Sequence, residues 1–160
     1  MTNIRVGIGY DIHKLESNLP FLLGGISLDY QKGIVAHSDG DIVFHALSDA
    51  LLGAAALGDI GHFFPDDDPK YKNINSAIIL KSVIEHLVDL NYEVVNVDVT
   101  IVLEKPKLQP IIHSIKNTVA QHLNVNSDQV NIKATTSEKM GFVGREEGIV
   151  CYAVVLIEKI

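Results

Sequence analysis

The sequence is short of cysteine, of arginine and of long apolar runs, and each shortage excludes a class of protein. A single cysteine, Cys151, excludes an internal disulfide and any metal knuckle built from several cysteines. In the apolar segment 149–157 we expect it to be a small buried residue. No apolar run approaches the roughly 20 residues that cross a membrane. The N-terminal segment also has no signal-peptide core.

Positive charge is scarce as well, with 13 Lys and Arg against 20 Asp and Glu and a formal net charge of −7. This balance argues against nucleic acid or an anionic membrane as the main partner. We expect a reducing, cytoplasmic compartment, with an organellar location after removal of a transit peptide left open. An anionic small substrate would need a local cluster of metal, Lys or Arg, and the two arginines are Arg5 and Arg145.

The 160 residues, 47% of them hydrophobic, suit one domain over 1–160. Apolar alternation and helical periodicity predict the following elements. Strands are expected at 4–13, 92–104, 129–136 and 149–158, one or two short strands within 20–30, and helices at 41–57, 74–91 and 108–124; segments 58–73 and 137–148 are expected as loops. This order indicates an α/β (α+β) domain with one mixed β-sheet backed by helices on one face.

Asp11 and His13 are two residues apart at the end of the first strand, so they project from one face. A carboxylate and an imidazole suit Zn²⁺ or a similar ion. His45, from the helix at 41–57, would be a third ligand and would leave a fourth position open. Polar residues where a strand meets a loop are the simpler interpretation.

Asp41, His45 and Asp49 recur every four residues and therefore share a helix face. They form either a solvated acidic stripe or a metal-ligating histidine whose other ring nitrogen a carboxylate orients. The remaining histidines are not spaced with other candidate metal ligands in a comparable way; they are His62, His86, His113 and His122.

Three loop regions carry further polar groups. The acidic segment 59–68 is either a plain turn or a site for sugar or polyol hydroxyls. Segment 134–148 places hydroxyls, amides and Lys139 and Arg145 on a Gly-rich loop, which suits phosphate, although a polar hairpin would have the same composition. Glu138 could hold a second divalent ion. Lys105 or Lys107, before the helix at 108–124, could form an anion site.

Five segments occur in the order found in one enzyme family: GYDIH, AHSDGDIVFHALSDALLGAAALGDIGHFFPDDD, NVDVTI, KPKL and KATTSEKMGFVGREEGI. From about residue 5 to 157 the chain resembles the 2-C-methyl-D-erythritol 2,4-cyclodiphosphate synthases of the non-mevalonate route to isoprenoid precursors. The resemblance implies a homotrimer with active sites between subunits. It also implies Zn²⁺ on Asp11, His13 and His45, and Mg²⁺ or Mn²⁺ on Glu138.

In that family a cytidine diphosphate ester of methylerythritol 2-phosphate is cyclised with release of CMP. The resemblance implies catalytic roles for His37, which would steady transition-state charge, and Thr136, which would assist the transferring phosphate. The substrate would contact Asp11, His13, His37 and Ser38 at its phosphates, and Asp59, Ile60, Gly61, Phe64, Pro65, Asp66, Asp67 and Asp68 at its methylerythritol part. The cytidine pocket would comprise Leu103, Glu104, Lys105, Pro106, Lys107, Leu108 and Gln109 together with Ala134, Thr135, Thr136, Ser137 and Glu138, and Phe142 and Arg145 would close the site.

Two other functions stay open on the residues alone. A metal-dependent phosphohydrolase would use the open metal position to activate water. A trimeric nucleotide-binding or structural-zinc module is disfavoured because structural zinc sites usually carry four ligands rich in cysteine.

Overall fold

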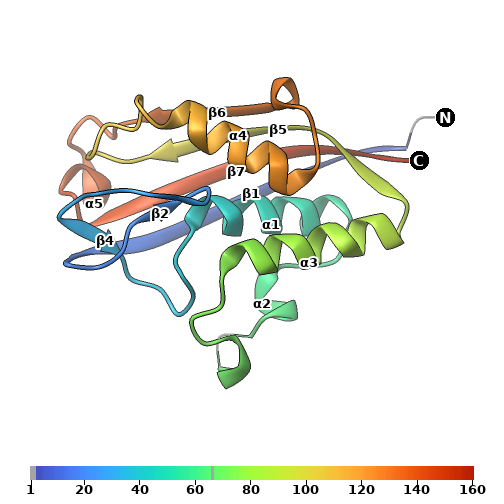
Figure 1. The fold of residues 1–160 in the computed structure, drawn as a ribbon, viewed down its shortest axis with the longest axis horizontal. Coiled ribbons are helices and arrows are strands. Elements are labelled where there is room, and N and C mark those ends of the chain that lie inside the picture. Colours follow the sequence, from blue (N-terminus) through green and yellow to red (C-terminus); the bar gives the residue numbers. More distant parts are fainter. Residues whose placement is uncertain (1–2, 66) are drawn as a thin grey trace.

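A five-stranded mixed sheet with helices packed on one of its faces forms the fold (Figure 1). The computed structural model describes residues 3–65 and 67–160. The strand order is β4-β1-β7-β5-β6, and every neighbouring pair is antiparallel except β5 and β6. The strands are β1 (Ile4–Ser17), β4 (Lys32–Ile34), β5 (Tyr92–Val102), β6 (Val130–Thr135) and β7 (Gly148–Lys159), with a separate hairpin of β2 (Leu22–Leu23) and β3 (Ile26–Ser27).

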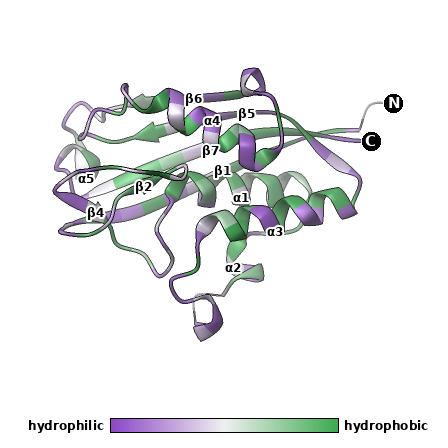
Figure 2. Ribbon diagram, viewed as in Figure 1, coloured by the Kyte–Doolittle hydropathy of each residue, from purple (hydrophilic) through white to green (hydrophobic). Residues whose placement is uncertain are grey.

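The long helices are α1 (Ile42–Ala54), α3 (Ser76–Asp89) and α4 (Ile112–Leu123). Hydrophobic residues run along α1 and along the central strands, so α1 lies in the core between the sheet and α3 (Figure 2). Short helical turns occupy α2 (Ile60–Phe63), α5 (Gly141–Gly144), η1 (Pro69–Tyr71) and η2 (Ser127–Gln129). No helix in the described part of the chain is long and apolar enough to cross a membrane.

Two glycines let β1 lie directly against α1. A Cβ added at Gly7 would lie 1.9 Å from the carbonyl oxygen of Ala50, and one at Gly9 would lie 1.8 Å from that of Ala46. No side chain fits at such distances, so the backbones of strand and helix are in contact. This close approach brings the residue after Gly9 on the same face, Asp11, toward the helix position next to Ala46, which is His45.

The opposite face of β1 and β7 is apolar and open to solvent. Val6 and Ile8 are 66% and 68% exposed, because alternate residues of β1 point away from α1. The other exposed apolar side chains of this face are Ile4, Tyr10, Ile12, Tyr152 and Val154. Exposed apolar surfaces of this kind are found at interaction sites of folded proteins.

The predicted strands and long helices are confirmed, although β1 continues past residue 13 to Ser17, and three further details differ. The strand β4 was not predicted, because three residues containing a glycine carry no periodicity. The expected loops at 58–73 and 137–148 contain the short helices α2 and α5. The third long helix begins at Ile112 rather than 108, since Pro110 has no N–H and restrains the residue before it.

Candidate active site

Three side chains from β1 and α1 converge on one point. Oδ2 of Asp11 lies 3.0 Å from Nε2 of His13 and 3.0 Å from Nδ1 of His45. The two ring nitrogens are 3.3 Å apart. His45 is buried in α1, whereas Asp11 and His13 are half-buried at the end of the β1 segment that crosses it. The sequence-based grouping of these three residues is therefore reproduced in space.

The Asp11 carboxyl is held ionised within this group. Burial raises its pKa, but the hydrogen bonds and charges of His13 and His45 outweigh burial and lower the pKa from 3.8 to about 2. The group therefore presents a carboxylate and two imidazoles to one small volume.

The spacing of the donor atoms fits a tetrahedral metal ion. Ligands at about 2.0–2.1 Å from such an ion lie about 3.3 Å from one another. The three separations here are 3.0, 3.0 and 3.3 Å. One carboxylate and two histidines can therefore hold a metal at three corners and leave the fourth for water or a substrate oxygen.

The outer nitrogens of both histidines meet polar groups that sequence reasoning missed. Nδ1 of His13 lies 3.2 Å from the carbonyl oxygen of Val35. Nε2 of His45 lies 2.8 Å from Oγ of Ser76 and 3.1 Å from Oγ of Ser38. Ser76, at the start of α3, is completely buried. A buried serine 31 residues away from the histidine carries no signal in the sequence.

The carboxylates on the His45 face, Asp41 and Asp49, have structural partners, so the stripe is not a solvated one and neither of these two carboxylates orients the other ring nitrogen of His45. Asp41 is fully buried and caps α1, and its oxygens also accept the N–H groups of Gly24 and Gly25 at 2.8 and 2.6 Å. Asp49 accepts the N–H of Ile60 at 2.8 Å. Burial raises the pKa of both carboxyls.

The segment predicted for the methylerythritol part starts at α2, beside α1. Asp59 caps α2 by accepting the N–H of His62 at 3.0 Å, and Asp68 caps the turn η1. Phe64 packs its ring edge-on to Tyr71 at 5.2 Å. Ile60, Gly61, Pro65 and Asp67 lie along the same segment, half-buried or exposed. Asp66 lies outside the described residues.

The two segments predicted for cytidine lie side by side. The N–H of Leu103 donates to the carbonyl of Thr135 at 2.9 Å, and the N–H of Ser137 donates to the Glu104 carboxylate at 3.2 Å. The side chains of Leu103 and Leu108 belong to the hydrophobic core, which leaves backbone atoms for any ligand contact. Pro106, Lys107, Gln109 and Ala134 are half-buried or exposed.

The remaining predicted residues lie on exposed turns. Thr136 donates its hydroxyl to Glu138 at 3.2 Å, and Glu138 has a left-handed backbone with φ of 53°. Arg145 is paired with Glu147 at 3.0 Å, and Phe142 is also exposed on α5. His37, predicted to be catalytic, is exposed on the loop before α1.

Within one chain the metal-ligating group and the Thr136–Glu138 turn are well separated. The strand register places Asp11 opposite Cys151, Cys151 opposite Ile101, and Ile101 opposite Ala134. Asp11 and Ala134 are therefore three strand spacings apart across the sheet, a distance of about 14 Å. The two halves of the predicted phosphate site therefore do not meet within this chain.

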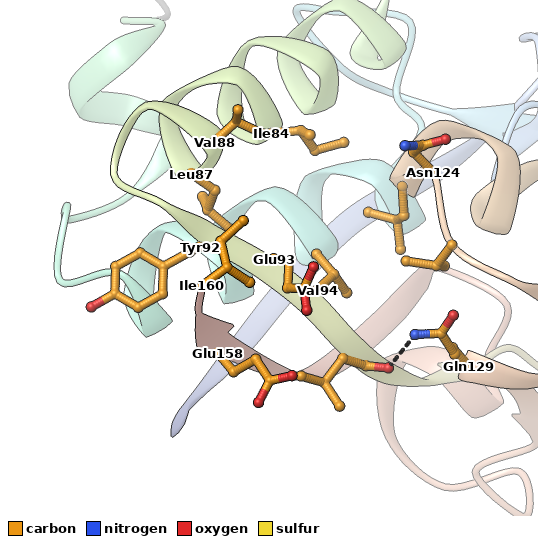
Figure 3. Close-up of a pocket in the computed structure, with 13 residues that line it drawn as sticks. Ile84, Leu87, Val88, Tyr92, Glu93, Val94, Asn124, Gln129, Glu158 and Ile160 are labelled. Carbon is orange, nitrogen blue, oxygen red and sulfur yellow. Dashed lines mark hydrogen bonds between the residues drawn. The ribbon is translucent and has the colours of Figure 1, made fainter. Parts of the chain in front are cut away.

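A separate apolar cavity of about 410 Å³ lies where α3 ends and β5 begins (Figure 3). Its lining includes the apolar side chains of Leu87 and Val88 of α3 and Val94 of β5, together with the carboxylates of Glu93 and Glu158. It contains none of the predicted site residues.

Comparison with known proteins gives consistent results. The model of the YgbB family matches residues 4–158. The 2-C-methyl-D-erythritol 2,4-cyclodiphosphate synthase of Histophilus somni (strain 2336) is 51% identical over 156 residues, which cover 98% of this chain and 96% of the relative.

Two solved structures have closely similar folds. The bifunctional IspDF of Campylobacter jejuni matches with a TM-score of 0.96 and 39% identity, over 100% of this chain and 43% of that one. IspF of Plasmodium falciparum, in a CDP complex, matches with a TM-score of 0.88 and 34% identity, over 99% of this chain and 98% of that one.

Proposed function

The chain belongs to the YgbB family of 2-C-methyl-D-erythritol 2,4-cyclodiphosphate synthases, and from this premise we propose how its residues carry out the reaction. The substrate is 4-diphosphocytidyl-2-C-methyl-D-erythritol 2-phosphate. An oxygen of its 2-phosphate forms a bond to the β-phosphorus, the bond from that phosphorus to the CMP oxygen breaks, and CMP leaves with the electron pair. The convergence of Asp11, His13 and His45 is the observation that carries this assignment.

Zn²⁺ is the ion we propose for this group, because one carboxylate and two imidazoles at tetrahedral spacing suit it. When bound, it supplies positive charge to phosphate oxygens. The attacking group is already an anion, so the site needs no strong base. Bringing two anionic groups into line is the main barrier, and orientation and charge neutralisation lower it.

The protein's own side chains orient the substrate around this group. We assign phosphate contacts to His37 and Ser38, which lie on the loop leading into α1. The N–H of Asn73 donates to the carbonyl of His37 at 2.8 Å, which supports a fixed backbone there. The segment that starts at Asp59 would hold the methylerythritol hydroxyls.

A second subunit completes the site in this proposal. Thr136 and a Mg²⁺ or Mn²⁺ ion on Glu138 have to reach the same diphosphate, yet their turn starts about 14 Å from Asp11 across the sheet. The exposed apolar face of β1 and β7 supplies a surface on which copies of the chain can pack. We therefore propose a homotrimer of one-domain subunits with its active sites between neighbours.

The test is ³¹P NMR of the purified protein with the cytidylylated substrate and divalent metal. The expected products are CMP and a ring diphosphate. Inorganic phosphate without the ring diphosphate would refute the assignment and favour a metal-dependent phosphohydrolase.

His45→Ala is expected to abolish cyclisation and zinc binding. His113→Ala serves as the matched control, because His113 is exposed on α4 and contacts Asn117. Equal activity of the two variants would remove His45 from the site.

A further inference from the structure

The outer ring nitrogen of His45 leads into a series of hydrogen bonds. Oγ of Ser76 lies 2.8 Å from this nitrogen, Nε2. The Ser76 hydroxyl donates to Oδ1 of Asp39, and the Ser76 N–H donates to Oδ2 of the same carboxylate at 3.0 Å. Ser76 is completely buried and His45 is buried, whereas Asp39 at the end of the series is half-buried.

The protons available along this series of hydrogen bonds determine the tautomer of His45. A carboxylate only accepts, so the one hydroxyl proton of Ser76 goes to Asp39. The Ser76 oxygen must then accept at its contact with His45, which places the imidazole proton on Nε2. In the neutral, metal-binding form of the ring, Nδ1 then carries the lone pair that faces the proposed metal position; without the metal, this nitrogen lies 3.0 Å from Oδ2 of Asp11.

We propose that Ser76 and Asp39 are positioning residues for the metal site: they fix His45 in the tautomer and ring orientation that ligate through Nδ1. The inference rests on the proposed function, because it concerns the ion assigned there. Groups that orient a ligating histidine typically change metal affinity by about 10- to 100-fold.

Ser38 also contacts Nε2 of His45, at 3.1 Å, but it is held differently. It is half-buried, and its oxygen accepts the N–H of Gly40 at 3.2 Å, which leaves its proton uncommitted. Its hydroxyl could therefore donate to or accept from the ring. Ser76, anchored twice to Asp39, has one arrangement only, so it decides the position of the imidazole proton.

Two backbone hydrogen bonds connect the segment before α3 to the loop that carries His37 and Asp39. The N–H of Asp39 donates to the carbonyl of Ile74 at 3.1 Å, and the N–H of Asn73 donates to that of His37 at 2.8 Å. The segment before α3 thus holds the backbone of His37 and Asp39 while Ser76 holds the ring of His45. The start of α3 fixes the geometry of both.

The test compares zinc affinity of the full chain with Ser76→Ala and Ser48→Ala, measured by competition with a chelator. Ser48 is the matched control: it is also completely buried, but its hydroxyl donates to the carbonyl of Phe44 at 2.7 Å. We expect about 10- to 100-fold weaker zinc binding for Ser76→Ala and unchanged binding for Ser48→Ala. Equal affinities of Ser76→Ala and the wild type would overturn the inference and leave the proposed function intact.

A second measurement does not depend on how any variant folds. In the zinc-free wild type, long-range ¹H–¹⁵N spectra of the imidazoles report which nitrogens of His45 carry a proton, and we expect a proton on Nε2 whether or not Nδ1, which faces the Asp11 carboxylate, carries a second one. A proton on Nδ1 alone would overturn the inference. A wild type that binds no zinc at all would overturn both this inference and the metal assignment beneath it.

Discussion

Gly9→Ala should separate the strand that carries Asp11 from the helix that carries His45. The new Cβ would lie 1.8 Å from the carbonyl oxygen of Ala46, and real Cβ atoms essentially never come closer than 3.0 Å to such an atom. Strand and helix must therefore move apart by the difference, at least 1.2 Å. Both contacting groups are backbone, so no side chain can turn away to relieve the clash.

This shift is large compared with the tolerance of the metal site. Asp11 Oδ2 and His45 Nδ1 are 3.0 Å apart, and each lies within two residues of the clash. Overpacking of a core costs about 1–3 kcal/mol, occasionally more. We expect the upper end, about 3 kcal/mol, which lowers the melting temperature by about 6–12 °C in a domain of this size. Zinc affinity should fall with it.

Thermal unfolding and chelator competition measure the two effects, with Gly53→Ala as the control. Gly53 lies in the same helix, and a Cβ there would find its nearest neighbour at 4.0 Å. Replacing it should stabilise the helix by about 0.5–1 kcal/mol. If Gly9→Ala unfolds at the wild-type temperature and binds zinc equally well, the reasoning from backbone contact is wrong.

Two further variants test the carboxylates beside the site. Asp41→Ala leaves four N–H groups without their acceptor: those of Gly24 and Gly25 and two at the start of α1. The free energy of unfolding, measured with urea, should fall by about 3 kcal/mol. A fall below about 1 kcal/mol would contradict this role of Asp41. Asp49→Ala removes the acceptor of the Ile60 N–H and so loosens the start of α2, where we expect the substrate to bind. In steady-state kinetics KM should therefore rise by a larger factor than kcat falls. An unchanged KM would show that α2 does not contribute to substrate binding.

Periodicity accounts for the part of the site that was predictable. Asp11 and His13 share a face because strand residues alternate, and this follows from their spacing alone. The meeting with His45 depends on which face of α1 lies on β1. That choice is made by Gly7 and Gly9, which look unremarkable in the sequence but allow backbone contact.

The roles of the supporting residues could not be predicted, because they depend on distant partners. Asp41 lies in a helical repeat with His45, which suggested a shared function, but its oxygens face a glycine turn 16 residues earlier. Ser76 at the start of a helix looks like an ordinary polar residue near a cap. Only the packing of α3 beside α1 brings it to His45.

The charge balance of the chain bears on the proposal that metal ions take part in this reaction. Two of the cations near the predicted nucleotide segments already have partners: Arg145 pairs with Glu147 at 3.0 Å, and Lys105 with Glu146 at 3.1 Å. Exposed pairs of this kind are weak and can rearrange, but opening them leaves two carboxylates facing the substrate. In a chain with a net charge of −7, this leaves Lys107 and Lys139 as the exposed lysines of these segments for which the structure shows no ion pair among the described residues. In the proposed mechanism, most of the charge that draws two phosphate groups together comes from ions held by residues such as Asp11. If the inference about Ser76 is right, the orientation of His45 determines how firmly such an ion is held.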